Sequence, residues 1–159
     1  MSESLYNTKF EIGLRALFIL KGLNFKPCSL ERLSYLDYLS LYIEDIKPKE
    51  KNLHPRYPFQ LIEAYGKKKI LKESMINFSY KGLIDVINYD GLFFQSNVNT
   101  IWFLAPFDNE YSKQLSKNID IIINEIGNKT DKEIKSLIFT NNVDDSNEFY
   151  DFYLLGDDV

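Results

Sequence analysis

The N-terminal part of the sequence predicts a helix over residues 9–21 with apolar side chains on two of its sides. Thr8 and Glu11 fit a capping box, in which each side chain accepts a hydrogen bond from the other residue's backbone amide, and Gly22 ends the helix. One apolar row contains Phe10, Leu14 and Leu17, and the other contains Ile12, Ala16, Ile19 and Leu23. Such a helix needs apolar partners on both sides, so it must be buried centrally or sandwiched between a core and a second protein.

The following segment predicts a second helix over residues 30–46. Pro27 separates it from the first helix, Ser29 can cap it, and leucine and isoleucine recur along it with the helical period. Asp37 lies among the tyrosines of this helix. An unpaired buried carboxylate is costly, so we expect an arginine or lysine beside Asp37.

Two further patterns set the predicted fold class. Residues 47–58 form a basic, proline-containing loop, and a third helical region follows over residues 59–80, in which Gly66 predicts a kink or a break. After it, two β-rich runs flank an Asp-Gly pair, which is a strong hairpin signal. We therefore predict a mainly α protein with a small β-hairpin, in which helix, helix, loop, helix and hairpin make a winged helix-turn-helix-like core.

The predicted core covers residues 1–97, and a C-terminal helical extension with an acidic tail covers residues 98–159. In this extension, Asp108 can cap a long helix that Gly127 ends. A second capping box at residues 130–133 predicts a further helix that runs to about residue 140.

Charge is distributed unevenly along the chain. Residues 47–81 carry 9 basic and 3 acidic groups, a local net charge of +6, whereas residues 82–159 carry 5 basic and 14 acidic groups, a local net charge of −9. The two parts could face different partners, or they could neutralise each other within the fold. In the basic part, the lysines of the third helix are predicted to contact DNA phosphate, the alternative being a solvated cluster. These lysines are Lys67, Lys68, Lys69 and Lys72.

The sequence holds no recognisable catalytic constellation. His54, the only histidine, lies outside any nucleophile or zinc motif, and Cys28, the only cysteine, has no partner for a disulfide or a zinc site. We therefore predict that the chain is not an enzyme and needs no cofactor or metal, with a small enzyme that uses His54 as an alternative. The absence of a signal peptide and of a bilayer-length apolar run predicts a cytoplasmic protein.

Four stretches of the chain resemble a known family. They are YNTKFEIGLRALFIL (6–20), LERLSYLDYLSLY (30–42), NLHP (52–55) and KKKILKESMINFSYKGLIDV (67–86). Together they look like the middle component of ABC three-component antiphage systems, the small subunit of Lamassu-type complexes. This resemblance implies a non-catalytic adaptor that bridges or regulates an SMC-like ABC ATPase, which senses DNA, and an effector, often a nuclease.

The matching residues suggest where partners would bind. The predicted partner interface consists of Phe10, Glu11, Gly13, Arg15, His54, Arg56 and Tyr57. Gly13 costs a helix about 1 kcal/mol relative to alanine, which a close approach of another helix or of a partner would explain. His54 could pack inward to set its loop, or outward against another subunit. The alternative from another functional class is a winged-helix transcription regulator that binds DNA on its own.

Overall fold

The computed structural model describes residues 8–56 and 60–140. Within these residues the elements are α1 (Lys9–Gly22), β1 (Cys28–Ser29), α2 (Leu30–Leu41), the 3-10 turn η1 (Ile43–Asp45), α3 (Gln60–Tyr80), β2 (Ile84–Asn88), β3 (Leu92–Ser96), α4 (Val98–Leu104), α5 (Glu110–Ile126) and α6 (Asp131–Thr140). The predicted fold class is confirmed: the protein is mainly helical with one small antiparallel sheet. The predicted acidic tail lies outside the described residues.

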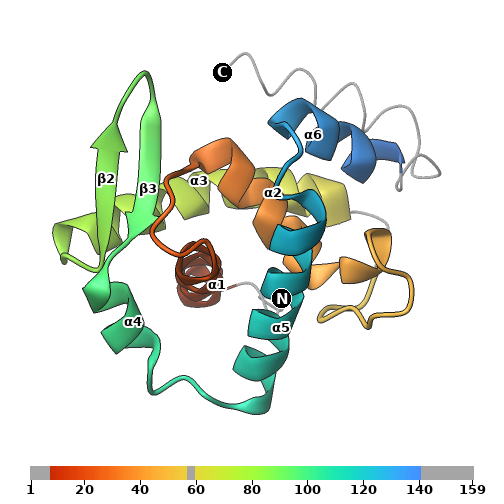
Figure 1. Ribbon diagram of the computed structural model, residues 1–159, viewed down its shortest axis with the longest axis horizontal. Coiled ribbons are helices and arrows are strands. Elements are labelled where there is room, and N and C mark those ends of the chain that lie inside the picture. Colours follow the sequence, from red (N-terminus) through yellow and green to blue (C-terminus); the bar gives the residue numbers. More distant parts are fainter. Residues whose placement is uncertain (1–7, 57–59, 141–159) are drawn as a thin grey trace.

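Helix α1 occupies the centre of the molecule, as its two apolar sides predict. Figure 1 shows α1 nearly end-on, surrounded by α2, α3, α4 and α5, and α1 contacts each of these four helices. Its side chains at Ala16, Leu17, Ile19 and Leu20 are fully buried. The other elements of the same chain therefore cover most of both apolar rows of α1.

Helix α2 begins where Ser29 predicts, since the Ser29 hydroxyl accepts a hydrogen bond from the Arg32 amide at 3.1 Å. It ends at Leu41 rather than at residue 46. The carbonyl of Leu41 accepts hydrogen bonds from the amides of Leu53 (2.9 Å) and His54 (3.4 Å), so it does not continue the helical ladder. The chain then forms η1 and a long connection to α3.

Helix α3 runs continuously from Gln60 to Tyr80, so the break predicted at Gly66 is wrong. A Cβ atom at Gly66 would meet no other atom within 4 Å, so neither packing nor the helix requires a glycine there. Gly13 differs, because a Cβ atom there would lie 2.9 Å from the ring of Phe78 and 3.3 Å from the Cβ of Ser74. The close approach predicted at Gly13 is therefore confirmed, and the approaching helix is α3 of the same chain.

The sheet contains the predicted hairpin, in which β2 and β3 pair in antiparallel fashion from Ile84↔Ser96 to Asn88↔Leu92. Asp90 and Gly91 form the turn with positive φ angles of 52° and 129°. The two-residue strand β1, which the sequence did not predict, pairs with the other edge of β3 and gives the order β1-β3-β2. This pairing ties the segment between α1 and α2 to the hairpin.

Helices α4 to α6 complete the core. Asn109, rather than the predicted Asp108, caps α5, and its side chain accepts a hydrogen bond from the Ser112 amide at 2.9 Å. The inward side of α5 joins the same hydrophobic core as α1 and α2 through Leu115, Ile119, Ile122 and Ile126. One core therefore extends across residue 97, where the sequence places a boundary between two parts.

Candidate functional site

A charged pair that is closed off from solvent joins α1 to α2. Arg15 Nε donates a hydrogen bond to Asp37 Oδ1 at 2.8 Å, and Arg15 Nη2 donates to Asp37 Oδ2 at 3.2 Å. The two side chains are only 1% and 3% exposed. Arg15 is thus the basic partner that the sequence predicts for Asp37. Burial opposes ionisation of this carboxyl, but the charge and hydrogen bonds of Arg15 outweigh burial and lower the pKa of Asp37.

Three more polar side chains surround this pair. His54 Nε2 lies 3.3 Å from the Tyr111 hydroxyl, and the charge of Lys67 acts on both Asp37 and His54. Burial, together with the positive charges of Arg15 and Lys67, lowers the pKa of His54 to about 4, so its imidazole is neutral at pH 7. We call Arg15, Asp37, His54, Lys67 and Tyr111 the buried ionic cluster.

The loop that carries His54 is fixed to the end of α2. The amides of Leu53 and His54 both donate to the Leu41 carbonyl, and Arg56 forms an ion pair with Asp45 of η1. The His54 side chain is 4% exposed, so it packs inward and sets the position of its loop. Arg56 remains partly exposed but already has an acidic partner within the chain.

All four stretches that resemble the family meet in the buried ionic cluster. The first stretch supplies Arg15, the second Asp37, the third His54 and the fourth Lys67. Gly13, also from the first motif, is buried at the contact of α1 with α3. In this chain the side chains of these motif residues form the interior and hold together elements that are far apart in sequence.

The remaining residues of the predicted interface lie in different environments. Phe10 is 56% exposed, and its ring lies 6.4 Å from the ring of Phe107. Glu11 is partly buried beside Arg15; burial raises its pKa, and its Oε2 atom has no hydrogen-bond partner among the described residues. Tyr57 lies outside the described residues. Phe10 and Arg56 are thus the predicted interface residues whose side chains reach the surface to a substantial extent.

The four lysines predicted to contact DNA do not share one surface. Lys67 is 6% exposed because it lies on the same side of α3 as Leu71 and Met75, at spacings of four and eight residues. Lys68 is partly buried, whereas Lys69 and Lys72 are exposed. The lysines of α3 that remain open to solvent therefore form a small patch, and Lys67 belongs to the interior.

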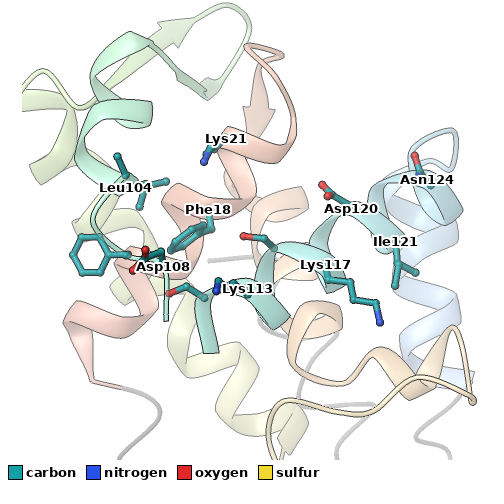
Figure 2. Close-up of a pocket in the computed structure, with 13 residues that line it drawn as sticks. Phe18, Lys21, Leu104, Asp108, Lys113, Lys117, Asp120, Ile121 and Asn124 are labelled. Carbon is teal, nitrogen blue, oxygen red and sulfur yellow. The ribbon is translucent and has the colours of Figure 1, made fainter. Parts of the chain in front are cut away.

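A groove with a volume of about 580 Å³ lies between α1, the α4–α5 connection and α5. Figure 2 shows Phe18 and Leu104 in its apolar part, with charged side chains around them. These charged residues are Lys21, Lys113, Lys117, Asp108 and Asp120. Because both signs of charge line this open groove, it has no clear preference for an anion or a cation.

Two members of the buried ionic cluster were not recognised from the sequence. Tyr111 is distant in sequence from all four matching stretches, and no local pattern marks it. The burial of Lys67 could have been predicted, since Lys67, Leu71 and Met75 follow the helical period of a buried face. It was not predicted because lysine is usually exposed to solvent.

The described part of the chain offers little for thiol or metal chemistry. Cys28 is buried, and burial raises the pKa of its thiol to about 12, so the reactive thiolate is disfavoured. Over residues 8–56 and 60–140, no group of side chains has the arrangement of a metal site. None of the helices in these ranges has the length and apolar character that a bilayer span requires.

Comparison with known proteins places these motifs in a family. The sequence model of the family described as ABC-three component (ABC-3C) system Middle Component 2 matches residues 5–148. A search of curated proteins and a search of solved structures gave no match. The family match spans the four stretches that supply the buried ionic cluster and every described helix and strand. The chain therefore belongs to the Middle Component 2 family of ABC three-component systems.

Proposed function

We propose that this protein is a non-catalytic adaptor in an antiphage defence complex of the Lamassu type. It would bridge an SMC-like ABC ATPase and an effector, often a nuclease, in the cytoplasm. The observation that carries this proposal is the family match over residues 5–148, because a middle component belongs to a system with two further components. DNA contact by this subunit would be weak or indirect.

The structure supports a binding role in two ways. The matching residues Arg15, Asp37 and His54 are buried and serve the fold, which leaves other residues to form the binding surface. The surface, in contrast, exposes several large apolar side chains and an open groove of mixed charge, both of which suit a protein partner.

Co-expression with the proteins encoded beside this chain tests the adaptor role. We expect affinity purification through a tag on either neighbour to recover all three chains, and size-exclusion chromatography to show one complex. A matched expression that lacks this chain should leave the ATPase and the effector unconnected. If those two proteins assemble with each other and leave this chain behind, the adaptor role is wrong.

The absence of catalysis in this subunit is part of the same proposal. His54→Gln tests it, because glutamine keeps a polar side chain but cannot act as an acid–base group. We expect complex assembly and phage protection to change together in this variant. Loss of protection in a fully assembled complex would instead identify His54 as catalytic and favour the enzyme alternative.

A second candidate is a winged-helix regulator that binds DNA alone. The order α1, β1, α2, α3, β2, β3 and the sheet order β1-β3-β2 favour it, because a winged helix places a hairpin beside its third helix. The connection over residues 42–59 is, however, much longer than the turn of three or four residues that is usual in a helix-turn-helix. A regulator should bind a duplex by itself, with affinity falling steeply as salt increases.

A further inference from the structure

The β2–β3 hairpin and α4 form one side of the molecule, away from α5 and α6 (Figure 1). Side chains at the start of α4 tie this helix to the base of the hairpin. Asn97 Nδ2 donates a hydrogen bond to Asp85 Oδ1 at 3.0 Å, and the Thr100 hydroxyl donates to the Leu83 carbonyl at 2.5 Å. We call the surface of residues 84–104 the hairpin–α4 face.

Exposed apolar side chains are concentrated on this face. Among the described residues, nine large apolar side chains are exposed, and six of them lie between residues 84 and 104. These six are Val86, Tyr89, Leu92, Val98, Ile101 and Trp102. Single exposed apolar residues are common on proteins, whereas apolar residues that cluster mark an interaction site. In the sheet, Val86 and Leu92 lie on the same side as the buried Phe94, so the exposed apolar side chains stand together mainly on the outward side of α4.

Helix α4 shows the pattern most clearly. Thr100 and Leu104 are buried against the rest of the protein, while Val98, Ile101 and Trp102 lie at the i, i+3 and i+4 positions of the outward side. Trp102 is the only tryptophan of the chain and is 75% exposed. Tryptophan is strongly enriched among the residues that dominate binding energy at protein interfaces.

The charge of the face limits what can bind there. Residues 84–104 contain Asp85 and Asp90 but no lysine or arginine, and Asp108 and Glu110 continue this acidic stretch toward α5. A polyanion such as DNA would be repelled by these carboxylates. Two copies of this chain meeting through the same face would also bring acidic groups together, because a two-fold contact pairs identical surfaces.

We propose that the hairpin–α4 face docks a cationic, apolar segment of another protein of the complex. The identity of that protein as a component of the same system rests on the adaptor role proposed above. Apolar side chains of the partner cover Trp102 and its neighbours, and lysine or arginine side chains face Asp85 and Asp90. Electrostatic complementarity of this kind favours the correct partner and speeds association.

Trp102 offers a direct probe of this surface. The chain is produced with fluorotryptophan, which labels one position because the chain has one tryptophan. Its fluorine NMR signal is recorded alone and after addition of the unlabelled purified ATPase or effector. We expect the signal to shift and to lose its sensitivity to solvent isotope when one of these two proteins binds.

Two variants and a matched control complete the test. Trp102→Ala should weaken capture of that partner by about tenfold or more. Neutralising Asp85 and Asp90 to asparagine should weaken capture mainly at low salt, because it removes long-range attraction. The control, Glu73→Gln with Glu133→Gln, changes two exposed acidic residues on α3 and α6 and should leave capture unchanged.

The outcomes separate this inference from the adaptor role. If a complex forms while the Trp102 signal stays in its solvent-exposed state, the docking face is wrong and the adaptor role stands. A signal that changes with the concentration of this chain alone would show self-association and overturn the proposed occupant. If neither purified component binds, both the adaptor role and the docking face are refuted.

Discussion

The buried ionic cluster and the hairpin–α4 face show opposite relations between sequence pattern and exposure. The cluster gathers charged residues from the recognisable motifs and encloses them, with Arg15 and Asp37 almost fully buried. The hairpin–α4 face exposes apolar residues of which all but Val86 lie outside those motifs, with Trp102 at 75% exposure. Family-defining residues can therefore report how a chain folds, while the proposed docking surface lies mostly in segments that no motif marks.

The largest expected effect concerns the buried ion pair. Arg15→Ala should lower the free energy of unfolding by about 3–5 kcal/mol, because it leaves Asp37 buried without its partner. Chemical denaturation at pH 7 measures this change. The double variant Arg15→Met with Asp37→Leu removes both charges and should recover most of the lost stability, since apolar replacements of a buried pair are often tolerated.

If Arg15→Ala lowered the free energy of unfolding by less than about 1 kcal/mol, the buried pair would contribute no more than an exposed ion pair does. The contrast between the buried ionic cluster and the hairpin–α4 face would then not hold.

The second effect depends on pH and involves His54. Its pKa is about 4 in the folded protein and 6.5 in an unfolded chain. As pH falls from 6.5 to 4, the unfolded chain binds a proton that the folded chain does not, so the free energy of unfolding decreases, by up to about 3 kcal/mol. Denaturation between pH 4 and 7 measures this slope, and His54→Gln should flatten it.

Asp37 acts in a different pH window. Because its pKa is lowered from 3.8, its stabilising contribution is present above that value and is lost as pH falls through the lower folded-state pKa. If His54→Gln left the pH dependence of the free energy of unfolding unchanged above pH 4, titrating groups other than His54 and Asp37 would have to cause that dependence.

The third effect compares two glycines in helices. Gly13→Ala places a methyl group 2.9 Å from the ring of Phe78 and should destabilise the protein by about 1–2 kcal/mol, despite the better helix propensity of alanine. Gly66→Ala meets open space and should stabilise it by about 0.5–1 kcal/mol. Thermal unfolding of both variants checks the opposite signs, and equal signs would refute the close contact of α1 with α3.

The smallest effect on stability belongs to the hairpin–α4 face. Trp102→Ala should change the free energy of unfolding by no more than about 0.5 kcal/mol, because an exposed side chain contributes little to the core. The same variant is expected to impair partner capture. A large loss of stability would show that Trp102 supports the fold and would remove the contrast between the two regions.

Much of the fold follows from local sequence patterns. The two apolar sides of helix α1 allow a position at the centre or between the core and a second protein, and the structure has the first. The Asp-Gly turn predicts the pairing of the strands on either side of it. A buried Asp37 requires a basic partner, and Gly13 within a helix indicates a close neighbour. The sequence therefore predicted both contacts, although it did not identify the side chains that make them.

The parts that failed depend on contacts between distant segments. Helix α2 ends early because Leu53 and His54 bond to the Leu41 carbonyl, which no pattern within α2 indicates. Strand β1 has two residues and exists because β3 pairs with it. Lys67 was assigned to the surface by its residue type, whereas its neighbours along α3 place it inside. Tertiary contacts decide such cases over local preference.

The central position of α1 also has a consequence for synthesis of the chain. One side of α1 packs against α5, so it stays uncovered until residue 126 has left the ribosome. At roughly 5–20 residues per second, the intervening stretch of about 100 residues takes about 5–20 s to make. During that interval the nascent chain carries an apolar helix side without its partner, and a fragment that stops at residue 97 would keep it uncovered permanently.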